Sequence, residues 1–258
     1  MSETTAALVT EGEDLDRLVA DLPAGDWQRP TPAAGWSIAH QIGHLAWTDD
    51  VAVLAIRDED GFDSVLAAAA SNPFGLASSE AERWSSRSPD ELVQAWRSGR
   101  RLLADLLDQI DPETRIRWFG PSMGVRSMAT ARLMETWAHG QDVADALGVQ
   151  RRPTQRLRDI AFLGVRTRDF AYQLHGHPVP DAEFRIELTG PDGEVWAWGE
   201  PGGDTVTGTA LDFCLVVTQR RGAAETDLVA TGEARHWLEF AQIFAPPATT
   251  FGHGRNDG

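Results

Sequence analysis

The sequence predicts an α+β protein, with a bundle of four helices over residues 1–150 and a smaller α+β domain behind it. Two observations support this. In the first half, apolar residues recur at the spacing of amphipathic helices through four long segments. After residue 180 the spacing changes to the alternation of a strand, first in Phe184, Ile186 and Leu188.

The ends of the four expected helices carry capping signals. Ser37 and Ser88 are residue types that commonly cap a helix N-terminus, and Pro89 suits the first helical position. Gly148 is a typical residue just beyond a helix C-terminus. A loop rich in Ala, Ser, Asn and Gly is expected between the second and third helices, at about 67–79. The expected helices span residues 4–22, 37–57, 88–110 and 127–147.

The second half is expected to begin with a connecting segment, 151–180, that contains a helix at about 155–175. The C-terminal α+β domain is then assigned to 181–245, and residues 246–258 are expected to form a flexible tail. Within the domain, Pro191-Asp192-Gly193 predicts a hairpin turn. The expected strands are 184–188, 194–199 and 205–207, and the expected helices are 210–218 and 234–244.

The net charge of the chain is −16, which argues against binding to nucleic acid or to an anionic membrane surface. All basic residues are arginine, since the sequence contains no lysine. Lysine Schiff-base or general-base chemistry is therefore excluded. A small anionic ligand would have to be held by arginine, whose planar fork of donors suits a carboxylate.

The sequence indicates a cytoplasmic protein. No apolar run approaches the roughly 18 residues that a membrane span needs, and the acidic N-terminus lacks the order of a signal peptide. The single cysteine, Cys214, excludes an internal disulfide. Because its neighbours are apolar, Cys214 is interpreted as a core residue.

A candidate metal site involves two of the expected helices. Glu135 and His139 are four residues apart and therefore lie on one helix face, from which both can bind one ion. On spacing alone, such a pair is more often simply solvated. A histidine from the helix at 37–57 could complete the set, and both His40 and His44 are candidates. Gly43 mildly favours His44, because a glycine there would allow a close approach of the helices. Three such ligands suit zinc, nickel or ferrous iron and leave a coordination position open for water or substrate.

The segments GWSIAHQIGHLAW and RLMETWAHGQDVADALG resemble the two signatures of the DinB/YfiT-like metal-binding bundles. More specifically, they resemble the mycothiol-dependent maleylpyruvate isomerase superfamily of actinobacteria. The first metal histidine of that family follows a tryptophan by eight residues, which falls on His44. The other two ligands fall on Glu135 and His139. The resemblance implies an up-down-down-up bundle around a divalent ion, usually zinc.

Two residues are candidates for a supporting role around these ligands. His40 stands where many relatives carry aspartate, so a partnership with a ligand is one interpretation of it. Asp142 follows His139 by three residues and could orient a ligand, because metal-bound histidines usually donate their second nitrogen to such a partner. Its alternatives are a cap of a neighbouring helix or a place on a solvated helix face.

The second half, FRIELTGPDGEVWAWGEPGGDTVTGTALDFCLVVTQRR, is similar to the C-terminal domain of the same family. The family's glycine-alanine-aspartate pattern before an arginine falls on Gly208, Ala210, Asp212 and Arg220. The resemblance implies that Arg220 binds an anionic group of the thiol or of the substrate. An ordinary surface arginine is the alternative, because Arg221 lies beside it.

In the family's isomerase the low-molecular-weight thiol mycothiol adds to a conjugated double bond, and rotation and elimination give the trans product. The resemblance implies a metal-dependent enzyme, an isomerase or S-transferase, that uses mycothiol to isomerise or conjugate a small electrophile. One alternative is a thiol-independent enzyme that uses the metal as a Lewis acid or through metal-bound water. Another is a noncatalytic metal-binding module. The expected partners are the substrate and the thiol, and the chain is expected to be a monomer or a homodimer.

Overall fold

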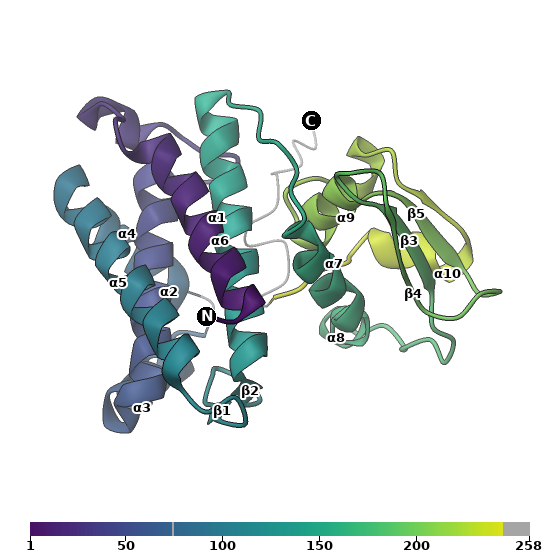
Figure 1. Ribbon diagram of the computed structural model, residues 1–258, viewed down its shortest axis with the longest axis horizontal. Helices are drawn as coiled ribbons and strands as arrows, with labels where there is room; N and C mark the ends of the chain where they lie inside the picture. The colour runs from purple at the N-terminus through teal and green to yellow at the C-terminus, as the bar shows by residue number, and fades with distance from the viewer. Residues whose placement is uncertain (74, 245–258) are drawn as a thin grey trace. The chain divides into compact units, whose positions relative to one another are not determined.

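The computed structural model describes residues 1–73 and 75–244. The chain divides into two compact units, Met1–Gln150 and Arg151–Gly258 (Figure 1). The first unit is helical and the second combines helices with a four-stranded sheet, so the expected α+β class is confirmed. The expected flexible tail, 246–258, lies outside the described residues.

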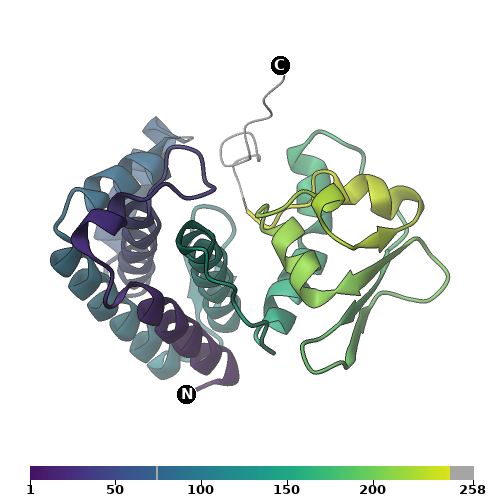
Figure 2. The ribbon, with the colours of Figure 1, turned by 90° about the horizontal axis from the view of Figure 1, so that it is seen from above.

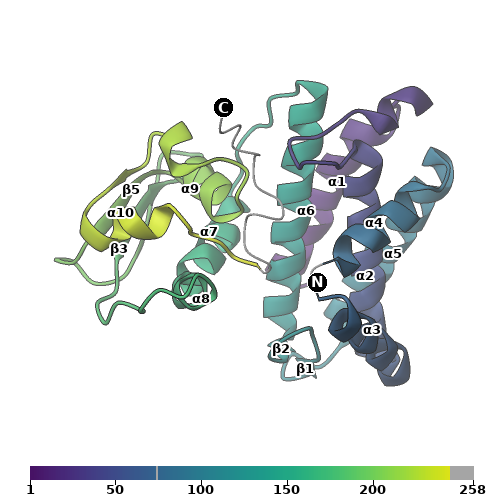
Figure 3. The ribbon, with the colours of Figure 1, turned by 180° about the vertical axis from the view of Figure 1, so that it is seen from behind.

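The first unit is built on four long helices (Figure 1, Figure 3). α2 packs against α5 and α6, and α1 packs against α6 and α5. Their inward faces form an apolar core that includes Leu15, Ile42, Leu45, Leu92 and Trp96. The helices of this unit are α1 (Glu3–Val19), η1 (Ala24–Gln28), α2 (Ile38–Arg57), α3 (Glu59–Ser71), α4 (Leu76–Ser85), α5 (Pro89–Gln109) and α6 (Val125–Leu147), and the strands are β1 (Arg115–Ile116) and β2 (Met123–Gly124).

The prediction of a loop at 67–79 is wrong, because α3 and α4 occupy most of the segment between α2 and α5. The run of alanines at 67–70 has the highest helix propensity of any residue type and continues α3. The side chain of Asp58 caps α3 by accepting the backbone N–H of Gly61. Phe62 and Trp84 then bury their rings in the core, which fixes both helices against α2.

The second unit contains a four-stranded mixed sheet (Figure 2). Its strand order is β4-β3-β5-β6. β3 pairs antiparallel with β4 and parallel with β5, and β6 pairs antiparallel with β5. Its elements are α7 (Leu157–Arg166), α8 (Arg168–Leu174), β3 (Arg185–Thr189), β4 (Val195–Trp198), β5 (Thr205–Thr209), α9 (Ala210–Val217), η2 (Ala223–Glu225), β6 (Val229–Ala230) and α10 (Gly232–Leu238).

Two expected helices of the second half differ in the structure. The helix expected at 155–175 is divided into α7 and α8 at Thr167, whose hydroxyl donates to the Leu163 carbonyl. The helix expected at 234–244 is α10, which ends at Leu238. α7 packs against α9 within this unit, and Gly164 permits the approach, because a Cβ there would lie 2.8 Å from Cγ2 of Val217.

Among residues 1–73 and 75–244, no helix has both the length and the apolar character that a membrane span requires.

Candidate metal centre

The three predicted ligands come together inside the first unit. His44 projects from α2, and Glu135 and His139 project from successive turns of α6. Oε2 of Glu135 lies 3.1 Å from Nε2 of His139 and 3.5 Å from Nε2 of His44. One potential ligand atom from each residue lies within 4.8 Å of the other two. This arrangement places two imidazoles and one carboxylate around a single point, as a metal site requires.

Gly43 allows a close approach between helices, but its partner is α4 and not α6, the helix that carries Glu135 and His139. A Cβ at Gly43 would lie 2.9 Å from Cβ of Trp84 and 3.2 Å from the carbonyl oxygen of Ala81. Gly43 therefore faces α4, a helix that the sequence did not predict. His44 reaches the other two ligands because it lies on the face of α2 that packs against α6.

His40 points to α4, and both of its ring nitrogens have partners there or at the start of α2. Nδ1 accepts the backbone N–H of Ser37 at 3.2 Å, which helps to cap α2. Nε2 lies 2.7 Å from Oε2 of Glu82. Because Nδ1 accepts, the proton of the neutral ring is on Nε2 and is donated to Glu82. The structure does not bring the ring nitrogens of His40 to the three ligands.

Gln41 takes the supporting role that was considered for His40. A chain of hydrogen bonds fixes its orientation: the Thr31 hydroxyl donates to the Trp36 carbonyl, and Nε2 of Gln41 donates to the Thr31 oxygen at 2.8 Å. Oε1 of Gln41 is left facing Nδ1 of His139 at 2.5 Å. An amide oxygen only accepts, so His139 carries its proton on Nδ1. Nε2 of His139 is then available as a ligand.

Gln41 is not predicted from the sequence, because only ionisable residues such as the neighbouring His40 were considered for the supporting role. Its helical phase was the usable signal, since Gln41 and His44 are three residues apart and lie on the same face of α2. Asp142, the residue considered for this role, has Oδ2 4.0 Å from Nδ1 of His139. That separation exceeds a hydrogen bond but allows an electrostatic contact.

The electrostatics of the cluster fit a bound cation. Burial by itself would raise the pKa of Glu135, but the imidazoles of His139 and His44 lower that pKa well below its usual range, so the carboxylate is ionised. Nε2 of His139 lies 3.1 Å from Oε2 of this carboxylate, so both atoms are close enough to bind one cation. Nδ1 of His44 is also buried without a hydrogen-bond partner among the described residues.

Aromatic rings form a wall around the two histidines. The Trp36 ring stacks on His139 with 5.9 Å between centroids, and it lies 5.3 Å from the His44 ring. The Trp47 ring lies 6.0 Å from His44 on another side. Both tryptophans are buried. Buried rings beside the two histidines lower the local dielectric constant, which strengthens the electrostatic interactions at the cluster.

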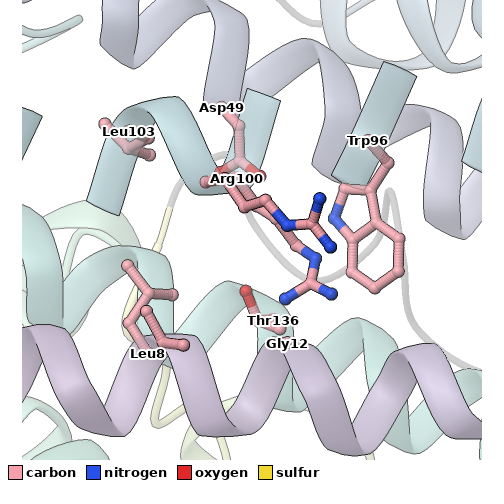
Figure 4. A pocket seen from close by; sticks show the side chains of 9 residues that line it. Leu8, Gly12, Asp49, Trp96, Arg100, Leu103 and Thr136 are labelled. Carbon is pink, nitrogen blue, oxygen red and sulfur yellow. The ribbon is translucent and has the colours of Figure 1, made fainter. Parts of the chain in front are cut away.

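A pocket elsewhere in the first unit has none of the three ligands in its lining (Figure 4). Figure 4 shows the carboxylate of Asp49, the guanidinium of Arg100 and the ring of Trp96 around it. Arg100 lies over the Trp96 ring and donates to Asp16, so its charge is already compensated within the protein. We therefore do not assign this pocket to the chemistry of the metal cluster.

Arg220 and Cys214 belong to the second unit. Arg220 is only 9% exposed, so it is not an ordinary surface arginine, and its Nη1 donates to the Thr218 carbonyl at 2.7 Å. Gln219 before it has a φ of 62°, a left-handed conformation that turns the chain just after α9. Cys214 is fully buried, and burial raises the pKa of its thiol, so it is an unreactive core residue.

The chain is similar to known proteins over nearly its whole length. Uncharacterised proteins from two strains of Mycobacterium tuberculosis are each 53% identical over 252 residues, which is 97% of this chain and 97% of each relative. Crystal structures of the mycothiol-dependent maleylpyruvate isomerase and of a histidine-to-alanine mutant share the fold, with TM-scores of 0.60 and 0.62. Their identities are 15% and 16%, and the matches cover 89% of this chain and 92% of theirs.

The family model named mycothiol maleylpyruvate isomerase N-terminal domain matches residues 8–144, which is more than half of the chain. The matched region contains His44, Glu135 and His139, together with Gln41. On this match, the chain belongs to the mycothiol maleylpyruvate isomerase family.

Proposed function

We propose that this protein is a metal-dependent enzyme that uses mycothiol to isomerise or conjugate a small electrophilic substrate. The observation that carries the proposal is the cluster of His44, Glu135 and His139 within the region that matches the family model. Three protein ligands leave at least one coordination position for an exogenous group, which is the property of a catalytic metal site.

The residues of this chain prepare the site for a divalent cation, most simply zinc. The ionised carboxylate of Glu135 supplies negative charge, and Gln41 holds His139 in the tautomer whose Nε2 faces the cluster. Trp36 covers the two imidazoles and limits the access of water. A cation bound there would lower the pKa of a coordinated thiol and so supply a thiolate at neutral pH.

The lack of an accessible thiol among the described residues supports a thiol co-substrate. Lysine is missing from the whole sequence, and the single cysteine, Cys214, is buried with a raised pKa. A reaction that needs a thiolate must therefore take it from a co-substrate. Arg220 is our proposed residue for binding an anionic group of the thiol or the substrate.

The second candidate is a thiol-independent enzyme, which the ligand set itself permits. Two histidines and a glutamate are also a known donor set for zinc sites that activate water. Under this alternative the same three ligands are needed, but mycothiol is not. The two candidates are separated by the dependence of turnover on the thiol.

The test is an assay of conjugated cis-configured acids and of alkylating electrophiles, with and without mycothiol. Our proposal predicts turnover that requires both the thiol and His44, so that the His44→Ala variant is inactive. Arg220→Met is expected to raise KM, whereas the matched variant Arg221→Met leaves it close to the wild-type value. Turnover that is indifferent to mycothiol would favour the second candidate, and a metal-loaded protein inert to every substrate would contradict both.

A further inference from the structure

A buried ion pair joins the two helices that carry the ligands. Nε of Arg132 on α6 donates to Oδ1 of Asp49 on α2 at 3.0 Å. The side chains are 2% and 4% exposed, respectively, so the pair is almost completely removed from solvent. It therefore connects α2 and α6 inside the first unit.

Thr48 extends this pair to the backbone of a ligand. Its Oγ1 accepts a hydrogen bond from Nη2 of Arg132 at 2.7 Å and donates to the carbonyl of His44 at 2.8 Å. Arg132 precedes Glu135 by three residues, so it lies about one helical turn from that ligand. Asp49, Arg132 and Thr48 thus link the turn that holds His44 to the turn that holds Glu135.

Stability alone gives a poor account of this arrangement. A buried ion pair loses the hydration of both charges, and replacement by well-packed apolar side chains is often neutral or stabilising. The hydrogen bonds of this pair are directional, so they set the separation and the register of the two helices more narrowly than apolar packing does.

We propose that Asp49, Arg132 and Thr48 are positioning residues for the metal site. They hold α2 and α6 at the separation that places His44 against Glu135 and His139. This inference rests on the proposed metal site, and it identifies the residues that set the geometry of that site. A metal site needs its ligands within about 0.5 Å of their productive positions, so a small shift of one helix weakens binding.

The experiment compares apolar replacements of the cluster with matched controls. The double variant Asp49→Leu/Arg132→Met removes both charges together, and Thr48→Val removes only the bridging hydroxyl. Thr136→Val is the control for Thr48: the buried Thr136 hydroxyl donates to the backbone carbonyl of Arg132, so its loss removes a hydroxyl from α6. It leaves the side-chain bonds of Arg132 to Asp49 and Thr48 in place. Arg97→Met is the control for the ion pair, since Arg97 joins α5 to Asp16 on α1, and these helices carry no predicted ligand.

Three measurements are made on each full-length protein: zinc affinity by chelator competition, the visible spectrum of the cobalt form, and the thermal midpoint of the metal-free form. The double variant and Thr48→Val are expected to bind zinc about 10- to 100-fold more weakly and to show an altered cobalt spectrum. Thr136→Val and Arg97→Met are expected to keep the zinc affinity within about 2-fold and the cobalt spectrum of the wild type, even where Arg97→Met lowers the midpoint.

The inference is overturned if both the double variant and Thr48→Val keep the zinc affinity and the cobalt spectrum of the wild type. That result would not contradict the proposed metal site. If the double variant does not fold, Thr48→Val decides alone, because it keeps the ion pair. Equal losses of affinity in Thr48→Val and Thr136→Val would also overturn it. A wild-type protein that binds neither zinc nor cobalt would instead contradict the proposed function.

Discussion

Gln41 has no acid-base chemistry of its own, yet its contact with Nδ1 of His139 leaves Nε2 of that ring as the candidate metal ligand. Its amide oxygen faces Nδ1, and its orientation is fixed in turn by Thr31. Gln41→Leu is expected to weaken zinc binding by about 10- to 100-fold, because the His139 ring loses both its tautomer and its orientation. Chelator competition measures the change, and Gln141→Leu on α6, whose amide bonds Asp145, is the matched control. Equal affinities in wild type and Gln41→Leu would contradict this role.

The second prediction at the residue scale concerns Cys214. Its thiol is fully buried, donates weakly to the Leu157 carbonyl, and has a raised pKa. We expect iodoacetamide to label it much more slowly in the native protein than in urea, because little thiolate forms and the sulfur is covered. We also expect Cys214→Ala to keep thiol-dependent turnover. Fast native labelling, or loss of turnover with the fold intact, would show that Cys214 takes part in the chemistry.

Among the helices, α1 and α5 are joined by Asp16, which accepts hydrogen bonds from Arg97 and Arg100. Burial tends to raise the pKa of Asp16, but the two guanidinium groups outweigh it and lower that pKa below its ordinary value of 3.8. A lowered native pKa means that the stabilisation is complete above the unfolded pKa and is lost as the pH falls through the native pKa.

The Asp16→Asn variant is therefore expected to be less stable than wild type by about 1–2 kcal/mol near neutral pH. The difference is expected to shrink below about pH 4 as the wild-type carboxylate is protonated. Urea unfolding at several pH values measures it. A difference that stays constant down to about pH 2 would show that the charge on Asp16 is not the cause.

The sequence predicted helices best where capping and apolar periodicity agreed. α5 begins at Pro89 after the Ser88 cap, and the reciprocal bond between Ser88 and Glu91 is present. α3 and α4 were missed because their alanine and serine residues were interpreted as loop composition, although alanine favours helix. β1, β2 and β6 have two residues each, too few to show a strand period.

The candidate site was predictable to the extent that it is local. Glu135 and His139 lie on one helix, so their spacing alone places them together. His40 and His44 are four residues apart and share a face of α2, so the choice between them depends on which turn of α2 lies beside Glu135. Only a resemblance or a structure supplies that information. The helical phase of Gln41 places it on the same face of α2 as His44, but its role depends on a contact between residues 98 positions apart in the sequence.

At the scale of the whole molecule, the three ligands, Gln41 and the pair of Asp49 and Arg132 all lie in the first unit, Met1–Gln150. We expect a fragment of residues 1–150 to fold and to bind zinc with nearly the affinity of the full chain. Circular dichroism and chelator competition test this. A folded fragment that fails to bind zinc would show that the second unit contributes to the metal site.

The central claim is that His44, Glu135 and His139 bind a divalent metal, and the most direct test is metal analysis of the full-length protein. After reconstitution with zinc and removal of excess metal, wild type is expected to retain about one equivalent per chain. His44→Ala, Glu135→Ala and His139→Ala are each expected to retain far less while remaining folded. A folded wild-type protein that retains no metal, or variants that retain as much as wild type, would contradict the claim.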